Sequence, residues 1–514
     1  MKKLLTLLLV IILILAAVVA YRTLTYPFEK NVSSEADQSI SKYQAEELSL
    51  KRFSGGIQIP TISSQDPEMV NWGHFDRFKS YLQEVYPQIF STMEYREVNG
   101  YGMVFHWKGQ DATLPPILFL SHYDVVPVTG LDNPEYEGEE IFRPQDKALP
   151  PVSEVPSEWD FHPFSGAVAN GRIYGRGTLD MKNMLFSLLE AADKLIGEGF
   201  TPAQDVYFAF GHDEEVGGLQ GATKIAEDFL DKGITFGAVF DEGGLIASKG
   251  TINDLDTNIA LIGLAEKGVS SLKVTVKGLG GHSSMPPLQS AIGKAAIIMQ
   301  HLEDNQMEAR IIPPIEDFLK NIGGQMAWTS RMAIANQWLF KPVLLGTFSK
   351  SPTTNALIRT TTALTMMEGS PAANVLSSEV SFVVNFRILP GNTLEEVKAH
   401  VAKACKGFEV EIEEFGSQRE ASKLSPSDAK PYLVMKESIE GIFPGTIVTP
   451  YVTVGGTDAY KYERISDHVY RFLPVVLNTS EQRTLHSENE YISIEAFGKM
   501  IAYFEKVIKT YGSK

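Results

Sequence analysis

Six side chains of the kinds that bind divalent metal ions stand out in the sequence. They are His122, Asp180, Glu214, Glu215, Asp241 and His486. Zinc prefers imidazole and carboxylate ligands where thiolates are absent. The chain has one cysteine, Cys405, which excludes an intrachain disulfide and a thiolate-rich metal site. Two histidines and three carboxylates, one of them bridging, can hold two zinc ions that bind and activate a water molecule.

Each of these residues also has an ordinary structural explanation. Asp180 can cap the helix that is expected to follow it, and residues 241–244 can form an acidic turn. A lone histidine or a pair of glutamates is usually a solvated surface feature. About 245 residues separate Asp241 from His486, so spacing alone does not bring His486 to the others. The metal-binding interpretation therefore depends on the residues as a set.

Several of these side chains directly follow short apolar segments that predict buried β-strands. The segments cover residues 117–121, 206–210 and 238–240. Together with helical periodicity at 184–195, they indicate strands alternating with helices, which is typical of a mostly parallel sheet covered on both faces. In such sheets ligands bind beyond the carboxyl ends of the strands, so we expect the three strand ends to deliver candidate ligands to one rim.

A further carboxylate accompanies the first histidine. Asp124 stands two residues beyond His122, on the same face of an extended segment. At this position its carboxylate can accept the second ring N–H of His122 and fix the tautomer of the imidazole. Asp124 is therefore a candidate for a residue that orients His122.

The length of 514 residues predicts more than one domain, because a single hydrophobic core rarely grows beyond roughly 300 residues. The pattern of strands and helices changes near Gly268. An alternation at 269–276 predicts a half-buried strand, and further strands are expected at 379–387 and 408–413. The first pattern then returns and ends in a predicted helix at 494–509. A catalytic domain interrupted by a smaller inserted domain is the simplest account.

We therefore predict an α/β fold divided into four segments. Residues 1–30 form an N-terminal segment, 31–267 the first part of the catalytic domain, 268–418 an inserted α+β lid domain, and 419–514 the second part of the catalytic domain. Between the candidate ligands, residues 129–158 are acidic and rich in proline, which predicts a surface loop.

The N-terminal segment has the features of an export signal. Lys2 and Lys3 precede an unbroken apolar run at 4–20. The run is near the lower limit of length for a helix that spans a bilayer. We interpret it as an uncleaved signal anchor, with a cleaved signal peptide as the alternative. The positive flank favours a cytoplasmic N-terminus, so the catalytic domain is expected to be exported, either anchored to the membrane or secreted.

Composition bounds the class of protein and its partners. Apolar residues make up 44% of the chain and charged residues 21%, as in ordinary globular proteins. The net charge of -17 disfavours nucleic acid as a partner, since phosphate backbones require a basic surface.

Six motifs form a highly specific combination. They are SHYDVVPV at 121–128, FSGAVANGRIYGRGTLDMK at 164–182, GHDEEVGG at 211–218, DEGG at 241–244, GGHSSMPP at 280–287 and LHSENEYIS at 485–493. Through them the chain resembles the M20 metallopeptidases across nearly its whole length after the N-terminal segment. IRTTTALT at 358–365 and VNFRILPG at 384–391 look like the carboxypeptidase S and N-fatty-acyl-amino-acid synthase/hydrolase branch of this family.

The resemblance implies a role for each candidate ligand. Asp180 would bridge two zinc ions. His122 and Asp241 would complete one metal site, and Glu215 and His486 would complete the other. The implied cofactor is two Zn²⁺ per subunit, with other divalent metals as alternatives.

The resemblance also implies roles outside the metal ligands. Glu214 would act as the general base, and Asp124 would orient its neighbouring histidine ligand. His282, in the inserted domain, would polarise the scissile carbonyl, often across a homodimer interface in this family. Asn374 and Arg387 would hold the substrate carboxylate. The ordinary explanations are a turn histidine among glycines for His282 and an exposed strand arginine for Arg387.

The expected activity is hydrolysis of an amide bond next to a free amino-acid carboxylate, as in a carboxypeptidase that acts on short peptides. An arginine can hold a carboxylate through two parallel hydrogen bonds, which favours such substrates. The alternative enzyme is an N-acyl-amino-acid amidohydrolase or synthase that acts on fatty-acyl amino acids. A third hypothesis is a metal-free binding protein with the same fold. The expected partners are a small peptide or N-acyl amino acid, a membrane through the N-terminal segment and a second subunit through the lid (dimerisation) domain.

Overall fold

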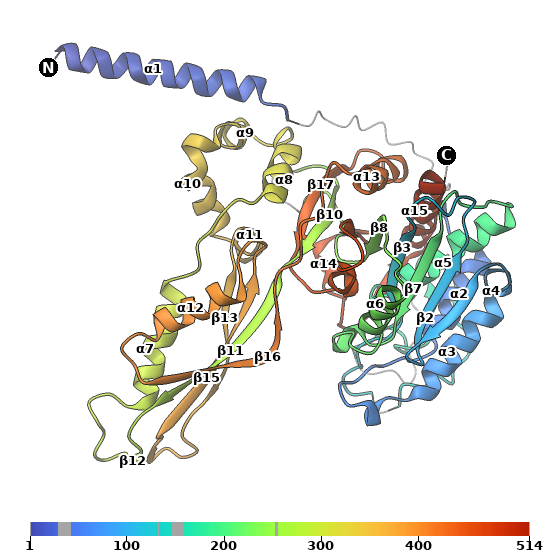
Figure 1. The fold of residues 1–514 in the computed structure, drawn as a ribbon, viewed down its shortest axis with the longest axis horizontal. Helices are drawn as coiled ribbons and strands as arrows, with labels where there is room; N and C mark the ends of the chain where they lie inside the picture. The colour runs from blue at the N-terminus through green and yellow to red at the C-terminus, as the bar shows by residue number, and fades with distance from the viewer. Residues whose placement is uncertain (1, 29–42, 132, 146–157, 252–254, 513–514) are drawn as a thin grey trace. The chain divides into compact units, whose positions relative to one another are not determined.

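The structure is a computed structural model that describes residues 2–28, 43–131, 133–145, 158–251 and 255–512 (Figure 1). Part of the predicted loop at 129–158 lies outside the described residues. The chain divides into two units. The large unit comprises Asn31–Leu264, Ser425–Pro450 and Thr457–Lys514, and the small unit comprises Met1–Lys30, Ala265–Leu424 and Tyr451–Gly456.

The large unit is built on a 10-stranded sheet, counted over the described residues, in the order β1-β2-β7-β3-β8-β18-β10-β9-β19, with β17 paired to β10. Its strands are β1 (Glu94–Val98), β2 (Gly102–Trp107), β3 (Ile117–His122), β7 (Val206–Gly211), β8 (Ala238–Asp241), β9 (Ile246–Ala247), β10 (Ile259–Glu266), β17 (Ile447–Thr453), β18 (Val469–Arg471) and β19 (Val476–Leu477). Strands β7, β3, β8 and β18 pair in parallel at the centre. The pairs β1/β2, β2/β7, β18/β10 and β10/β9 are antiparallel.

The predicted α/β class is confirmed, and the sheet is mixed rather than parallel throughout. A short hairpin loop explains one antiparallel edge. In this loop Asn99 and Gly100 have φ values of 52° and 84°. Asn and Gly adopt this left-handed conformation more readily than other residues, so the chain reverses between β1 and β2 without a crossover helix.

Helices and a second small sheet complete the large unit. The helices are α2 (Glu47–Ile57), α3 (Trp72–Val85), α4 (Pro87–Thr92), α5 (Lys182–Gly197), α6 (Ala222–Asp231), α13 (Lys430–Ile442), α14 (Thr479–Gln482) and α15 (Ile494–Gly512). The second sheet has the order β20 (Tyr491–Ser493), β6 (Arg172–Tyr174), β5 (Val168–Ala169) and β4 (Phe142–Arg143). The predicted helix at 494–509 is confirmed by α15.

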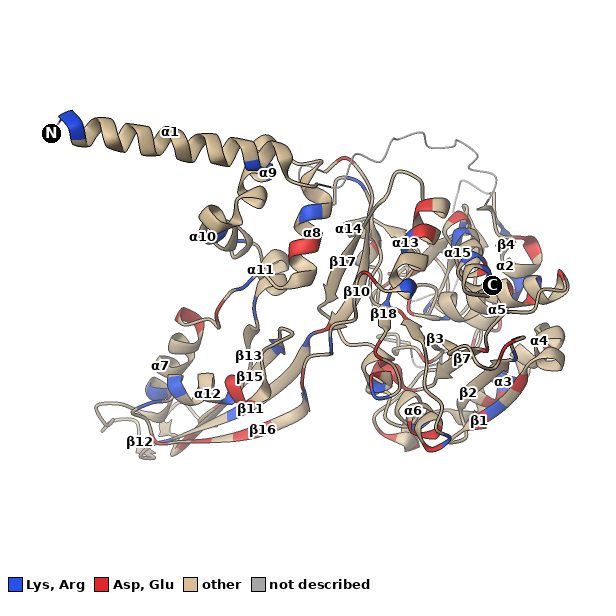
Figure 2. Cartoon of the chain, turned by 45° about the horizontal axis from the view of Figure 1, so that its top comes forward, with Lys and Arg blue, Asp and Glu red and all other residues tan. Residues whose placement is uncertain are grey.

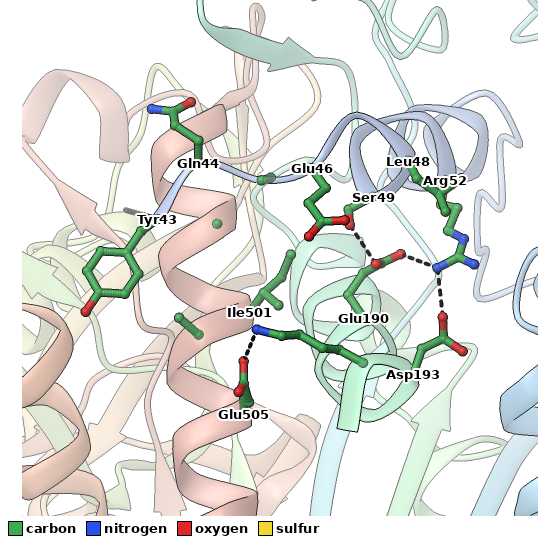
Figure 3. Close-up of a pocket in the computed structure, with 14 residues that line it drawn as sticks. Tyr43, Gln44, Glu46, Leu48, Ser49, Arg52, Glu190, Asp193, Ile501 and Glu505 are labelled. Carbon is green, nitrogen blue, oxygen red and sulfur yellow. Dashed lines mark hydrogen bonds and ion pairs between the residues drawn. The ribbon is translucent and has the colours of Figure 1, made fainter. Parts of the chain in front are cut away.

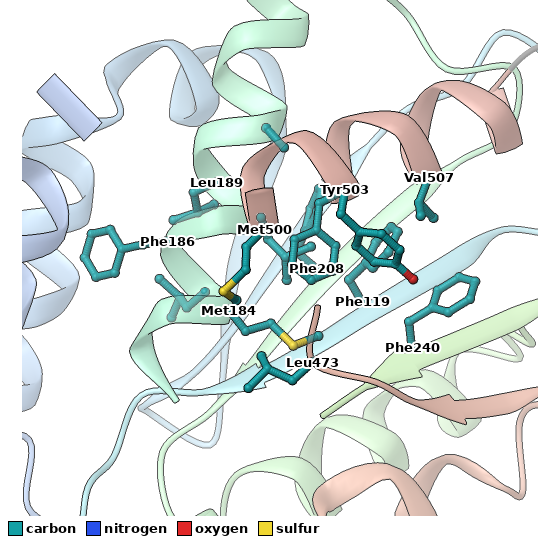
Figure 4. Close-up of a cluster of buried hydrophobic side chains, with 14 of the residues drawn as sticks. Phe119, Met184, Phe186, Leu189, Phe208, Phe240, Leu473, Met500, Tyr503 and Val507 are labelled. Atoms are coloured by element: carbon teal, nitrogen blue, oxygen red, sulfur yellow. The ribbon is translucent and has the colours of Figure 1, made fainter. Parts of the chain in front are cut away.

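Strand β3 shows why the central strands are continuously apolar. Side chains of a strand alternate between its two faces. Ile117 and Phe119 pack in a cluster with residues of α5 and α15 (Figure 4), whereas Leu118 and Leu120 pack in a separate cluster with residues of α6. Because both faces are covered, polar side chains are confined to the end of the strand, where His122 lies.

The small unit contains an antiparallel sheet and several helices. Its sheet has the order β13 (Thr361–Glu368), β15 (Glu379–Ile388), β11 (Gly268–Lys277) and β16 (Val410–Arg419), and a second pair joins β12 (Gly281–His282) to β14 (Val375–Leu376). Its helices are α1 (Lys2–Thr25), α7 (Ala291–Asp304), α8 (Pro313–Gly323), α9 (Trp328–Ala335), α10 (Gln337–Phe348), α11 (Pro352–Ile358) and α12 (Leu394–Ala404).

The alternation predicted at 269–276 is confirmed in β11. Leu272, Val274 and Val276 are buried, and the side chains between them are partly exposed. The buried set packs with Ile298 of α7 and Val397 of α12. One face of this sheet therefore forms the core of the small unit.

Candidate metal centre

His122 lies at the carboxyl end of β3 and faces several carboxylates. Its side chain is buried, and its Nε2 lies 3.1 Å from Asp180 Oδ1 and 3.3 Å from Glu242 Oε1. Glu214 Oε2 lies 3.9 Å from the same nitrogen. Burial lowers the pKa of His122, but hydrogen bonds to Asp124, Asp180 and Glu242 raise it well above its ordinary value. One imidazole therefore gathers acidic side chains from separate segments of the large unit.

Asp180 lies between the two predicted histidine ligands. Its Oδ1 faces His122, whereas its Oδ2 lies 3.0 Å from Nε2 of His486. The same nitrogen of His486 lies 3.2 Å from Glu215 Oε2, and Asp180 and Glu215 raise the pKa of His486 to about 10. A carboxylate that directs one oxygen toward each of two imidazoles has the geometry of a bridging metal ligand.

The candidate ligand atoms form two groups that fit a divalent metal ion. His122, Glu214 and Glu242 form one group and His122, Asp180 and Glu215 the other, and within each group the ligand atoms lie within 4.8 Å of one another. Glu215 Oε1 is buried and has no hydrogen-bond partner among the described residues, as expected of a metal ligand. Burial and the proximity of Asp180 raise the pKa of Glu242 to about 8. A divalent cation would relieve this repulsion between carboxylates.

Asp124 holds both His122 and the two neighbouring glutamates. Its Oδ1 lies 3.3 Å from His122 Nδ1 and accepts a hydrogen bond from the backbone N–H of Glu214 at 3.1 Å. Its Oδ2 accepts hydrogen bonds from the backbone N–H of Glu215 at 3.1 Å and from Ser63 Oγ at 2.7 Å. This fully buried carboxylate is therefore placed to orient His122, and it also fixes the turn that carries the glutamates.

Glu214 and Glu215 begin the short 3₁₀ helix η3 (Glu214–Val216) directly after β7. Gly217 and Gly218 follow with φ values of 109° and 63°, which glycine adopts at little steric cost. Burial and the Glu242 carboxylate raise the pKa of Glu214 well above its ordinary value, although His122 lowers it. A carboxylate with a raised pKa suits the transfer of protons near neutral pH.

Glu490, which sequence reasoning did not single out, links the Asp180 segment to the segment that carries His486. Its Oε1 accepts hydrogen bonds from the backbone N–H groups of Leu179 at 2.7 Å and Asp180 at 3.2 Å. Its Oε2 accepts a 2.6 Å hydrogen bond from Arg176 Nη1. The available signal was its place in the motif LHSENEYIS, four residues after His486.

At the end of β8, Glu242 Oε1 lies 3.3 Å from His122 Nε2, next in sequence to the predicted ligand Asp241. Asp241 is buried and, like the predicted ligand His486, belongs to neither group of ligand atoms. With burial and Asp458, it raises the pKa of Tyr462. Successive side chains at a strand end point to opposite sides, so only one member of this acidic pair can face His122. The motif DEGG signalled an acidic pair but did not distinguish its members.

His282 and Asn374 belong to the small unit and are neighbours there. His282 is exposed in the two-residue strand β12, and its Nδ1 lies 2.8 Å from Ser284 Oγ. The backbone N–H of Ser283 donates a 3.1 Å hydrogen bond to the carbonyl oxygen of Asn374. The structure therefore brings together two residues that lie about 90 positions apart in the sequence.

Arg387, also in the small unit, lies on β15 among other cations. Arg387 is exposed on its strand, and partial desolvation together with the Arg419 guanidinium lowers its pKa. Burial and Arg387 together lower the pKa of Lys267 to about 7. The Arg419 guanidinium is paired with Glu266 at 3.3 Å, so the guanidinium of Arg387 is the group suited to bind an anion such as a carboxylate.

A cavity of about 320 Å³ lies beside the metal centre in the large unit, with His486, Trp159, Val128 and Arg176 among the residues that line it. It has room for part of a small substrate next to a predicted ligand. A second cavity of about 320 Å³ lies between residues of α2, α5 and α15 (Figure 3). Its lining residues include none of the predicted site residues, so it is separate from the metal centre.

Comparisons with known proteins decide the family. The family described as Peptidase family M20/M25/M40 matches residues 148–510. The chain belongs to this family. It is 34% identical over 512 residues to the N-fatty-acyl-amino acid synthase/hydrolase PM20D1 of Xenopus tropicalis, covering 98% of this chain and 94% of the relative. It is 31% identical over 477 residues to the probable carboxypeptidase S-like 2 of Dictyostelium discoideum, covering 92% and 85%.

A solved structure shares the fold. The M20 family metallo-carboxypeptidase Sso-CP2 from Sulfolobus solfataricus aligns with a TM-score of 0.61 at 19% identity, covering 91% of this chain and all (100%) of that chain. The predicted family and enzyme class are therefore confirmed, and the chain is a hydrolase of a metal-dependent peptidase family.

Among the described residues, only α1 is long and apolar enough to cross a membrane. A signal sequence meets the same criteria, so the helix fits a signal anchor or a signal peptide.

Proposed function

We propose that this chain is a two-zinc hydrolase that cleaves the amide bond next to a free amino-acid carboxylate, with short peptides as its main substrates. The observation that supports this most directly is the position of Asp180, whose two carboxylate oxygens lie 3.1 Å from His122 and 3.0 Å from His486. Two metal ions held on either side of one carboxylate are a common arrangement for activating water toward an amide.

The proposed ligands follow from the distances between side chains. Asp180 would bridge the two ions. His122 and Glu242, in place of the expected Asp241, would complete one site, and Glu215 and His486 would complete the other. Glu242 is chosen for the first site because its Oε1 lies 3.3 Å from His122 Nε2. Bound zinc would supply Lewis acidity, which lowers the pKa of a water molecule and polarises the substrate carbonyl.

Glu214 is the proposed general base. It accepts a proton from the water molecule and passes it to the leaving nitrogen, a double role that its raised pKa favours. Asp124 keeps the His122 ring in one orientation through its 3.3 Å contact with Nδ1. These two carboxylates therefore act beside the metal ligands without serving as ligands themselves.

The small unit supplies the proposed substrate contacts. His282 donates a hydrogen bond to the oxyanion that develops on the scissile carbonyl. Asn374 and Arg387 hold the free carboxylate of the substrate, which the exposed guanidinium of Arg387 is suited to bind. In this family such a histidine often acts across a homodimer interface, so we also propose a homodimer formed through the small unit.

N-acyl amino acids are the second candidate substrates. The support is the 34% identity, over 98% of this chain, to a relative named N-fatty-acyl-amino acid synthase/hydrolase. Such a substrate has the same free carboxylate and the same type of amide bond as a peptide. The two candidates therefore require the same metal chemistry and differ in the group on the acyl side.

We further propose that α1 is an uncleaved signal anchor that leaves the large unit on the exported side of a membrane. Support comes from its 24 residues, the lysines at positions 2 and 3, and the absence of charged residues from there to Arg22. A helix of this length reaches across a hydrocarbon core of about 30 Å.

The test is a substrate panel with the zinc-loaded full-length protein in detergent. The panel contains a dipeptide, the same dipeptide with an amidated C-terminus, and an N-oleoyl amino acid, with Glu214→Gln as the matched inactive control. We expect hydrolysis of the free dipeptide and at least a tenfold loss for the amidated one, because the carboxylate anchor is removed. Faster hydrolysis of the N-oleoyl substrate would favour the second candidate. No turnover above the Glu214→Gln control on any substrate would contradict the proposed function.

A further inference from the structure

Helices α9 and α10 of the small unit expose an unusual number of large apolar side chains. Trp328 is 47% exposed at the start of α9, and Trp338, Leu339 and Val343 are 55%, 37% and 60% exposed on α10. In α10 only Leu344 is buried, although most of the helix is apolar. We call these four exposed residues the apolar patch. Large apolar side chains exposed together on neighbouring helices are candidates for an interaction site.

The patch adjoins the end of the N-terminal helix within the same unit. Asn336, between α9 and α10, is fully buried and donates hydrogen bonds from Nδ2 to the Val19 carbonyl oxygen at 3.2 Å and to Thr23 Oγ1 at 3.1 Å. Thr23 is also fully buried. A polar contact that is buried at both ends fixes where α1 meets the α9–α10 pair.

A second contact holds the segment just beyond α1. The Phe28 ring packs against Gly323, where an added Cβ would come within 2.3 Å of the ring. The Arg331 guanidinium lies 5.4 Å from the centre of the same ring. Contacts through Val19, Thr23 and Phe28 therefore attach α9 and its neighbours to the C-terminal end of α1, not to its middle.

The position of these contacts sets the level of the patch relative to a bilayer. The apolar run at 4–20 is about 26 Å long as a helix, which is shorter than the hydrocarbon core of about 30 Å, so the whole run and a few flanking residues are needed to cross it. Thr23 then lies where the helix leaves the membrane, and Val19 lies one turn inside that boundary. Helices α9 and α10 contact these residues through Asn336. Their exposed side chains therefore lie at the depth of the lipid headgroups.

We propose that the apolar patch rests on the phospholipid bilayer as a second membrane contact beside the anchor; this inference depends on the proposed anchor but not on the proposed chemistry. Tryptophan is favoured at the membrane interface, where an apolar ring and a polar N–H are both satisfied. Figure 2 shows that α10 carries little charge, and its one charged residue is Lys341. Lys341, with Arg331 and Arg22 nearby in the same unit, suits the phosphates of the headgroups.

The test uses the full-length chain reconstituted into phosphatidylcholine vesicles with brominated acyl chains, which quench tryptophan fluorescence at short range. The chain has five tryptophans, and two of them lie in the patch. We expect quenching relative to non-brominated vesicles, and we expect the double variant Trp328→Phe/Trp338→Phe to lose most of it. The matched control Trp72→Phe removes a tryptophan of the large unit and should leave the quenched component intact.

Flotation of the vesicles separates failure of the anchor from failure of the patch. A chain that does not float with the vesicles would refute both. A chain that floats without quenching, or whose quenching is unchanged in Trp328→Phe/Trp338→Phe, would refute the patch alone. If the patch instead contacts a second copy of the chain, a cysteine introduced at Val343 should form a disulfide-linked dimer while the tryptophans stay unquenched, and this result would also overturn the proposal.

Discussion

The large and small units carry their candidate functional residues in different ways. In the large unit, His122 and Asp124 are buried, and Asp124 is bonded to the backbone of Glu214 from a distant segment. In the small unit, His282 is exposed on a two-residue strand and bonds with Ser284, two positions away. The first arrangement suits a rigid metal site, and the second suits a residue that moves as substrate binds. Loss of a metal ligand in the large unit should therefore alter metal binding, whereas loss of His282 in the small unit should alter turnover and leave metal binding unchanged.

The largest effect is expected from Asp180→Ala. If Asp180 bridges both ions, its loss should empty both sites and lower kcat by roughly 10⁴-fold or more, the scale on which groups that act as one unit fail. Zinc per chain is measured by mass spectrometry. His486→Ala is the control and should mainly empty one site. Two full equivalents of zinc in Asp180→Ala would show that Asp180 does not bridge the two ions, and the large unit would then lack the proposed rigid metal site.

Glu214→Gln should have the next largest effect. The amide keeps the size of the side chain but does not accept a proton, so kcat should fall by roughly 10²- to 10⁴-fold. Zinc content should stay near that of the native chain, because Glu214 is not proposed to hold metal. Retained activity would show that another residue is the base.

His282→Ala tests the small unit directly. Loss of one donor to an oxyanion should lower kcat by roughly a hundredfold or more, with zinc content unchanged. Mixed dimers of Glu214→Gln and His282→Ala protomers should regain some activity if the histidine acts across a dimer interface, because one site in each mixed dimer is intact. Normal kcat in His282→Ala would reject its catalytic role, and a loss of zinc would contradict the distinction between the units.

The smallest effect is expected from the pair at the end of β8. Glu242→Gln should weaken zinc binding at one site by at least roughly 10- to 100-fold, the scale for loss of partners outside the ligand set, and excess zinc should restore part of the activity. Asp241→Asn, the matched control, should change zinc affinity by less than about tenfold if Glu242, whose Oε1 lies 3.3 Å from His122 Nε2, is the ligand at this strand end. The reverse order, measured by competition with a zinc chelator, would return the ligand role to Asp241.

Sequence patterns predicted the strands in which each face is either fully buried or exposed to solvent. Strands β3, β7 and β8 are buried throughout because helices cover the sheet, and β11 alternates because only one of its faces is buried. The antiparallel edges were not predicted, since pairing direction depends on short loops such as the one at Asn99 and Gly100. Helices α9 and α10 were also missed as an interaction surface, because apolar helices predict core unless their contacts are known.

The candidate site was predictable as a set of motifs but not as a geometry. His486 meets Asp180 only in three dimensions, and the resemblance to a family linked them before the structure did. The choice between Asp241 and Glu242 depends on the rotation of the chain where β8 ends, which spacing does not encode. Glu490 resembles any acidic loop residue in sequence, and only its burial and its bonds to Leu179 and Asp180 reveal its role.

The most direct test of the bridged two-metal centre is anomalous diffraction at the zinc edge from crystals of the zinc-loaded protein. The account predicts two strong peaks, one within about 2.0–2.2 Å of each carboxylate oxygen of Asp180, with His122 on one zinc and His486 on the other. A single peak, or two peaks of which only one contacts Asp180, would contradict it.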